Sequence, residues 1–245
     1  PHVEVAVAGS DCALVLRVLD PPTAADLDRL RSFERAEGVR VYLQPGGPAT
    51  VAPLTPNLEP LRYELGHFGL AIEFEPTDFI QVNATLNEAM VARALEILEL
   101  EPASHVLDLF CGLGNFSLPL ARSAGEVVGV EGDAGLVSRA ERNPRRQGIA
   151  NAAFHAEDLA HPAAWSAWTA RRYDRVLLDP PRAGAREVLP FVGGCGAARV
   201  VYISCHPGSL ARDAGILVRD HGFRLVAAGV MDMFPHTTHV EAMAV

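Results

Sequence analysis

From Thr85 to the end of the sequence, short apolar runs alternate with longer stretches of helical periodicity, and this rhythm constrains the fold more than any other feature. The apolar runs lie at residues 105–107, 126–130, 152–155, 175–178, 198–204, 223–230 and 240–245. Strands that alternate with helices predict an α/β fold with a doubly wound, mostly parallel sheet of seven strands. The last two runs are joined by residues 231–239, too few for a helical crossover, so we expect these strands to pair antiparallel.

The beginning of the chain follows a different pattern. Alternating apolar and polar residues suggest strands at residues 2–7, 13–18, 39–43 and 70–74. A helix is expected from Ala24 to about Ala36, because Thr23 can cap its first turn and Gly38 can end it. We therefore predict a small α+β domain over residues 1–75 and a larger domain over residues 76–245.

The charge balance of the chain bears on its partners. Among 245 residues, 49% are hydrophobic and the formal net charge is −9, so a polyanion would have to find a local basic patch. The candidate patches are three groups of arginines: Arg139, Arg142, Arg145 and Arg146; Arg171, Arg172 and Arg175; and Arg182 and Arg186. The alternative for each group is a solvated helix face.

The four cysteines show neither a CxxC pair nor the spacing of zinc ligands. This usage predicts reduced thiols, a cytoplasmic location and no metal site. No apolar run reaches about 18 residues, so we expect no transmembrane helix. The sequence starts at Pro1, directly before a strand-like alternation, and we expect it to be part of a longer protein.

Three of the expected strands end in residues that can do chemistry. Cys205 follows the run 199–204, Asp179 follows the run 175–178, and Asp108 opens a glycine-rich segment after the run 105–107. The carboxyl ends of parallel strands meet at one edge of a sheet, where open α/β sheets bind their ligands. We therefore expect these three positions to converge on one crevice.

The glycine-rich segment predicts a site for an adenosyl group. Gly112 and Gly114 let the backbone approach a ligand, but Ser117 stands where a dinucleotide-binding fingerprint requires glycine. Glu131, at the end of the next strand, can accept hydrogen bonds from two ribose hydroxyls. Asp158 is placed either to receive an adenine amino group or to cap a helix, and Phe110 can supply an apolar wall.

Seven segments together resemble the RNA uracil-5-methyltransferase family, and most closely its bacterial 23S rRNA type. They are DFIQVN (78–83), VLDLFCGLGNF (106–116), VGVE (128–131), LDPPRAG (178–184), VYISC (201–205), LARD (210–213) and DMFPHTTHVE (232–241). The resemblance implies the Rossmann-like fold of class I S-adenosylmethionine-dependent methyltransferases. It also implies that residues 1–75 are a central domain that contacts the RNA substrate, and that an amino-terminal RNA-binding barrel and four iron–sulfur cysteines precede the present sequence. This chain itself therefore does not support an iron–sulfur cluster.

The resemblance also assigns roles to individual residues. The methyl donor S-adenosylmethionine would be bound by Gln81, Phe110, Gly112, Gly114, Asn115, Glu131, Asp158 and Asp179. Cys205 would add to C6 of a uracil in 23S rRNA and Glu241 would remove the C5 proton, which makes a poorly nucleophilic carbon reactive. Such chemistry favours a raised pKa for the Glu241 carboxyl and a thiolate at Cys205.

Two further residues are candidate contacts for the substrate. Phe79 can stack on an extruded base, or it can belong to the core, and Arg182 follows Asp179 in the same turn. His206 stands where the family has asparagine after the catalytic cysteine, and Asp158 stands where the family often has asparagine. Cys111 is expected to be a packed side chain, and His236 and His239 to be structural.

Three alternatives remain open at this point. One is a relative that methylates tRNA with the same site. Another is an adenine-N6 or small-molecule methyltransferase, which would not need Cys205. The third is an RNA-interaction module that binds the cofactor without turnover. RNA is the partner that the first and third alternatives share, and the sequence implies no protein partner and no membrane.

Overall fold

The computed structural model describes residues 2–245, and the chain divides into two compact units. The first unit comprises the residues up to Leu65 together with Ala71–Ile80, and the second comprises Gly66–Leu70 and Gln81–Val245. Each unit is described by itself. The assignment of residues 1–75 and 76–245 to two functional domains stays a prediction.

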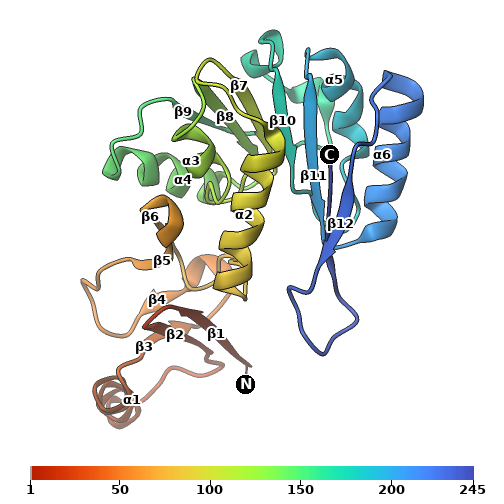
Figure 1. The fold of residues 1–245 in the computed structure, drawn as a ribbon. Helices are drawn as coiled ribbons and strands as arrows, with labels where there is room; N and C mark the ends of the chain where they lie inside the picture. Colours follow the sequence, from red (N-terminus) through yellow and green to blue (C-terminus); the bar gives the residue numbers. More distant parts are fainter. Residues whose placement is uncertain (1) are drawn as a thin grey trace. The chain divides into compact units, whose positions relative to one another are not determined.

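The first unit contains a four-stranded sheet in the order β1-β2-β3-β4, with α1 beside it (Figure 1). The strands are β1 (His2–Ala8), β2 (Asp11–Arg17), β3 (Arg40–Gln44) and β4 (Ala52–Pro53), and the helix is α1 (Ala24–Glu37). Thr23 caps α1 as expected, because its hydroxyl accepts from the Asp26 N–H while the Asp26 carboxylate accepts from the Thr23 N–H. Gly38 ends the helix in a left-handed conformation with φ 66°.

Two strands of this region are absent from the sequence prediction, the short β4 and the longer β5. β5 (Leu61–Leu65) pairs with β6 (Leu70–Phe74) in a separate two-stranded sheet. Only its two terminal leucines are buried, and the proline-rich residues directly before it give no strand signal. Short 3-10 turns at Pro48–Thr50 and Gly66–Phe68 complete the connections.

The second unit is built on a seven-stranded sheet in the order β12-β13-β11-β10-β7-β8-β9. Its strands are β7 (His105–Leu109), β8 (Glu126–Glu131), β9 (Ala152–Ala156), β10 (Arg175–Leu178), β11 (Arg199–Ser204), β12 (Ala228–Met231) and β13 (Glu241–Ala244). β13 pairs antiparallel with both β11 and β12, whereas β7 to β11 pair in parallel. The predicted doubly wound sheet and its antiparallel last pair are confirmed.

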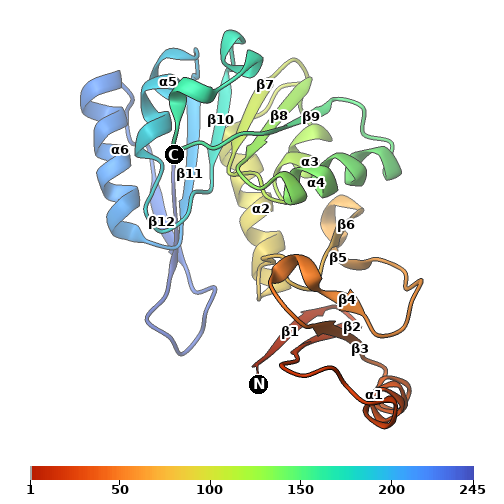
Figure 2. The same ribbon diagram turned by 180° about the vertical axis from the view of Figure 1, so that it is seen from behind.

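Helices cover both faces of this sheet, as the views from two opposite sides show (Figures 1 and 2). They are α2 (Ala84–Leu98), α3 (Ser117–Ala121), α4 (Ala134–Arg146), α5 (Leu189–Gly194) and α6 (Pro207–His221), with 3-10 turns at Pro162–Ala164, Ala167–Ala170 and Arg186–Val188. Alternate strand residues, among them Leu107, Leu178 and Tyr202, pack with α5 and α6 in one hydrophobic cluster. Their neighbours Val106, Leu177 and Val201 are fully buried on the opposite face, where α2 packs against β11. Both faces are therefore dry, as a parallel sheet requires.

The sixth expected run forms a shorter strand than the sequence suggests. The prediction placed a strand over residues 223–230, but β12 begins only at Ala228. α6 continues to His221, and Gly222 ends it with φ 75°, so the chain must still turn back towards the sheet. Before β12 starts, the N–H groups of Val226 and Ala227 donate to the Val245 carbonyl, and both backbone groups are thereby satisfied outside the regular ladder.

Candidate active site

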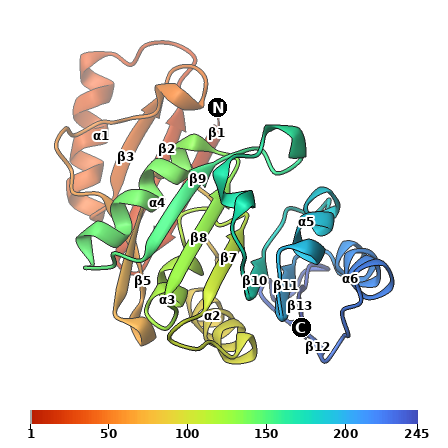
Figure 3. The same cartoon turned by 90° about the horizontal axis from the view of Figure 1, so that it is seen from above.

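The carboxyl edge of the second unit's sheet carries one polar side chain at each of five neighbouring strands. In the spatial order β13, β11, β10, β7 and β8, these side chains are Glu241, Cys205, Asp179, Asp108 and Glu131. β13 contributes its first residue because it runs antiparallel to β11, and the others lie at or just beyond their strand ends. Figure 3 looks along the strands and shows these five strands side by side. The predicted convergence of Cys205, Asp179 and the glycine-rich segment is confirmed.

Cys205 and Glu241 lie at corresponding positions of adjacent strands. The antiparallel register pairs Ser204 with Ala242, so the next position along each strand is Cys205 on one side and Glu241 on the other. Side chains opposite one another in an antiparallel pair have Cβ atoms about 5 Å apart. The sheet therefore places a thiol and a carboxyl group within reach of one small ring.

The Cys205 thiol is partly buried, and its pKa is raised by that burial and by the negative charges of Glu241 and Asp179. The Arg182 guanidinium acts in the opposite direction and lowers the pKa. The expected thiolate-favouring environment is therefore wrong for the protein without ligands. α6 does begin directly after Cys205, with His206 as its cap, but burial together with the two carboxylates leaves the pKa of the thiol raised.

The Glu241 carboxyl is only 5% exposed, and burial raises its pKa to about 7. This confirms the expected direction of the shift. A carboxyl group with this pKa can hold or release a proton near neutral pH, which is the property of a general base.

Two further carboxyl groups in the row have the same property. Burial, with the charges of Glu241 and Asp108, raises the pKa of Asp179 to about 7. Asp108 is fully buried, and burial raises its pKa to about 7 although the Ser117 hydroxyl donates to Asp108 Oδ2 at 2.5 Å. Asp108 Oδ1 is buried without a hydrogen-bond partner within residues 2–245. An oxygen of this kind is a candidate acceptor for a ligand.

The raised pKa of Asp108 makes stability depend on pH. Its folded-state pKa lies above the unfolded value, so the native state binds more protons, and this contribution to stability is lost as the pH rises towards 7. We expect the free energy of unfolding to fall by about 2 kcal/mol between pH 5 and pH 8 from this group. In urea titrations, Asp108→Asn should remove that part of the pH dependence. The exposed carboxyl change Asp220→Asn should leave it intact, and equal slopes for all three proteins would refute the assignment.

The glycine-rich segment folds into a tight turn after β7. Phe110 adopts a left-handed conformation with φ 65°, and both its N–H and that of Cys111 donate to the Val130 carbonyl. Gly112 and Gly114 have φ values of 53° and 89°, which only glycine adopts without strain. The Gly112 N–H donates to Glu131 Oε2 at 3.1 Å, so the turn and the end of β8 are held together.

Asn115 is held by a residue that sequence reasoning missed. Its amide nitrogen donates to Asn87 Oδ1 at 2.9 Å, and the Asn87 amide nitrogen donates to Asn115 Oδ1 at 3.0 Å. Asn87 is 3% exposed on the first turn of α2. A polar amide among the apolar positions of that helix was the only signal in the sequence, and it does not identify its partner.

Gln81 and Asp158 lie in different surroundings. Gln81 Oε1 is buried and has no hydrogen-bond partner within residues 2–245, so it is a second candidate acceptor. Asp158 is exposed; its Oδ1 accepts from the Ala160 N–H at 2.8 Å and its Oδ2 contacts the ring of His161 at 2.8 Å. These two bonds lower the pKa of Asp158. Asp158 therefore stabilises a turn, a role similar to the helix capping that was the alternative to adenine binding. Its contact with adenine stays a prediction.

The remaining predicted residues are Arg182, Cys111 and Phe79. Arg182 is exposed, and its guanidinium contacts Nδ1 of His239 at 3.2 Å, which gives that histidine the structural contact expected of it. Cys111 is buried and burial raises its pKa strongly, as befits a packed side chain. Phe79 is 72% exposed and belongs to the first unit, so core packing is excluded and stacking on a base stays a prediction.

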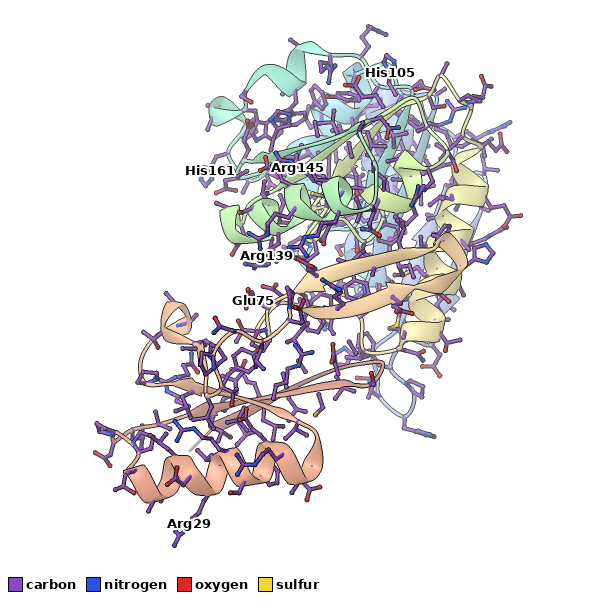
Figure 4. All side chains as sticks on the ribbon, turned by 90° about the vertical axis from the view of Figure 1, so that its left-hand side faces the viewer. Arg29, Glu75, His105, Arg139, Arg145 and His161 are labelled. Carbon is purple, nitrogen blue, oxygen red and sulfur yellow. The ribbon has the colours of Figure 1, made fainter. Side chains whose placement is uncertain are left out.

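The predicted basic patches are found mainly on one helix. Arg139, Arg142, Arg145 and Arg146 all lie on α4, and Figure 4 labels Arg139 and Arg145. Arg171 and Arg175 instead pair with Glu126 and Asp174. Within residues 2–245, no cluster of His, Cys, Asp or Glu could hold a metal ion. No helix in that range is long and apolar enough to span a membrane.

A family model and several known proteins match the chain. The model described as tRNA (Uracil-5-)-methyltransferase matches residues 69–245. The chain is 56% identical to the 23S rRNA (uracil(1939)-C(5))-methyltransferase RlmD of Alkalilimnicola ehrlichii, an alignment that covers 100% of this chain and 55% of the relative. It is 51% identical to the RlmD protein of Methylococcus capsulatus, over 100% of this chain and 56% of the relative. The chain thus spans about half the length of these relatives.

Solved structures show the same fold at low sequence identity. The Pyrococcus abyssi tRNA (uracil-54, C5)-methyltransferase in complex with S-adenosyl-L-homocysteine superposes with a TM-score of 0.75 at 23% identity, covering 96% of this chain and 56% of that chain. TYW2 of P. horikoshii in complex with MeSAdo gives a TM-score of 0.62 at 15% identity, covering 98% and 90%. These likenesses confirm the expected Rossmann-like, class I methyltransferase fold.

Proposed function

Because the chain belongs to the tRNA (uracil-5-)-methyltransferase family, we propose that it methylates C5 of a uridine in RNA, with Cys205 as nucleophile and Glu241 as general base. The observation that carries this proposal is the register of β11 and β13, which puts the thiol and the carboxyl group at corresponding positions of adjacent strands. The chain spans about half the length of its relatives, so the activity of a whole protein of that length is part of the proposal.

The chemistry needs the Cys205 thiol before methyl transfer and the Glu241 carboxyl group after it. Cys205 loses its proton and its sulfur adds to C6 of the uracil, which moves electron density to C5 as an enolate. C5 then takes the methyl group and still carries its own proton. Glu241 removes that C5 proton, the C5–C6 double bond re-forms, and the sulfur of Cys205 leaves with its electron pair. The pKa of Glu241, about 7, suits a group that must accept a proton at neutral pH.

The residues at the carboxyl edge fit S-adenosylmethionine. The left-handed turn leaves open space beside the backbone at Gly112, whereas Gly114 packs against Leu118 and Phe154. Glu131 can still accept from ribose hydroxyls through its remaining lone pairs. Asp108 Oδ1 and Gln81 Oε1 are buried acceptors without a hydrogen-bond partner in the described part of the chain, as an ammonium group of the methionine part requires. When bound, S-adenosylmethionine supplies an electrophilic methyl group on its sulfonium sulfur. Phe110, Asn115 and Asp179 complete the proposed binding set, and Asp158 would lie at the adenine.

We propose 23S rRNA as the substrate, since relatives that are 51–56% identical over the whole chain carry that name. tRNA is the second candidate, because the family model and the P. abyssi structure are both described by tRNA. The overall charge of −9 means that RNA would be held by a local basic surface, for which Arg182 and the arginines of α4 are the candidates. Phe79, in the first unit, is a separate candidate for stacking on a base.

Methyl transfer from radiolabelled S-adenosylmethionine separates these candidates. The purified chain would be incubated with 23S rRNA and with bulk tRNA, both lacking 5-methyluridine, and the full-length RlmD relative of Alkalilimnicola ehrlichii would be the positive control. We expect label in 23S rRNA, released as 5-methyluridine on nuclease digestion. Label in tRNA alone would favour the second candidate. Label in neither RNA from this chain, under conditions in which the relative is active, would refute the activity, and label in adenine would indicate a different methyltransferase.

A further inference from the structure

A buried charged network lies directly behind the candidate site and has no role in the chemistry described so far. Its centre is Asp213 on α6, whose side chain is fully buried. The carboxylate accepts from the Tyr202 hydroxyl at 2.6 Å, from the Arg212 Nε at 2.7 Å and from the Ala185 N–H at 2.8 Å. Burial acts to raise the pKa of Asp213, but these three bonds outweigh it and hold the pKa below its ordinary value.

The network grips the backbone of one particular segment, residues 179–185. Besides the bond from Ala185 to Asp213, Arg212 Nη2 donates to the Ala183 carbonyl at 2.7 Å. Gly184, between them, has φ 91°, and a Cβ atom there would lie 2.5 Å from Asp213 Oδ2 and would also overlap Arg212. Only glycine allows this close approach, so the segment is seated directly on the charged pair.

The network contacts two parts of the candidate site: the segment 179–185 and the elements on either side of Cys205. The gripped segment begins with Asp179 and contains Arg182, the cation that lowers the pKa of the Cys205 thiol. Tyr202 lies on β11, three residues before Cys205, and Asp213 lies on the helix that follows Cys205. One carboxylate therefore links the backbone beside Arg182 to both elements that flank the nucleophile.

A buried charge is a costly way to obtain stability alone. Removing the Asp213 carboxylate from water costs several kcal/mol, and apolar packing of the same volume is often equally stable. A fully bonded charged network instead fixes one geometry. Here the bonds end on backbone groups within three residues of Arg182, where geometry matters for the thiol.

We propose that Asp213, with Tyr202 and Arg212, is a positioning residue for the reaction: it fixes the segment 179–185 so that Asp179 and Arg182 are held against Cys205. This inference rests on the proposed function for its catalytic meaning, but the geometry that it asserts can be measured without turnover.

Two variants test the proposal. Asp213→Asn keeps the shape and removes the charge, and Tyr202→Phe removes one 2.6 Å bond while keeping the ring in the core. The first readout is the pH profile of Cys205 alkylation by iodoacetamide, followed by mass spectrometry of the Cys205 peptide. The segment carries both Arg182, which lowers the thiol pKa, and Asp179, which raises it, and the effect of Arg182 is the larger. If the segment is no longer held near the thiol, the midpoint should therefore move to higher pH in both variants, and more in Asp213→Asn.

The second readout is methyl transfer to RNA. A misplaced segment should lower kcat by about 10- to 100-fold in Asp213→Asn, and less in Tyr202→Phe, with a smaller change in KM for RNA. Asn151→Ala is the matched control, because the Asn151 amide also holds backbone carbonyls, those of Ala121 and Ala124, but at the opposite edge of the sheet. The control should lose stability and keep both the alkylation profile and kcat.

The outcomes are distinguishable. Folded Asp213→Asn and Tyr202→Phe proteins with the wild-type Cys205 profile and the wild-type kcat would overturn the proposal and leave the network a structural one. If the variants shifted the Cys205 alkylation profile but the wild-type protein methylated no RNA, the positioning would be supported and the proposed function refuted. Should Asp213→Asn fail to fold by circular dichroism, Tyr202→Phe decides the question alone.

Discussion

Cys205→Ala is expected to reduce methyl transfer to RNA by at least about 10⁴-fold, the scale of loss when a covalent nucleophile is removed. Without the sulfur, no bond forms at C6 and C5 of the uracil stays a weak nucleophile. Folding should be affected little, because the thiol is only partly buried. The measurement is single-turnover transfer of labelled methyl groups at saturating S-adenosylmethionine.

The matched control is Cys12→Ala, which removes a partly buried thiol from the first unit and should keep wild-type activity. Equal binding of S-adenosylmethionine by wild type and Cys205→Ala would show that the cofactor site is intact. A Cys205→Ala protein that still methylates RNA at the wild-type rate would exclude the covalent mechanism and favour an adenine-N6 or small-molecule methyltransferase.

Glu241→Gln is expected to stop the reaction after methyl transfer. The amide cannot remove the C5 proton, so the methylated ring stays bonded to Cys205, and turnover falls by about 10²- to 10⁴-fold. A covalent complex of protein and RNA should therefore accumulate and survive a denaturing gel. In wild type, kcat/KM should rise with pH through about 7, because Glu241 must be ionised to act as a base and its pKa is raised to about 7.

Glu96→Gln is a suitable control for this change. Glu96 is an exposed carboxylate of α2 that pairs with Arg93 at 2.7 Å, so its loss should change neither turnover nor adduct level. If Glu241→Gln turned over at the wild-type rate, another group would be the base. Asp179 is the nearest alternative in the row, with a pKa raised to about 7 in part by the charge of Glu241.

The fold and the row of polar side chains were predictable because each strand is marked in the sequence by a short apolar run. The apolar runs of β7, β8, β10 and β11 are each followed by a polar residue, and parallel pairing brings those ends to one edge, so Asp179 and Cys205 could be placed together from the sequence alone. The antiparallel last strand followed from the shortness of residues 231–239, and it returns Glu241 to the same edge. Periodicity and connection length therefore carried this part of the site.

Long-range polar partners could not be predicted in this way. Asn87 and Asn115 are 28 residues apart, and Asp213 and Ala185 are also 28 residues apart, so neither bond leaves a periodic trace in the sequence. The pKa of Cys205 was predicted in the wrong direction for a related reason. The helix start after it was visible in the sequence, whereas burial and the combined charges of Glu241 and Asp179 depend on how three strands assemble.

The most direct measurement of the central claim uses RNA in which 5-fluorouridine replaces uridine. Fluorine at C5 cannot leave as a proton does, so Glu241 cannot complete the reaction and the bond between sulfur and C6 should persist. Incubation with S-adenosylmethionine, followed by nuclease and protease digestion and mass spectrometry, should find a methylated fluorouridine nucleotide on the peptide that contains Cys205. Label on another residue, or no adduct while uridine-containing RNA is methylated normally, would contradict the account.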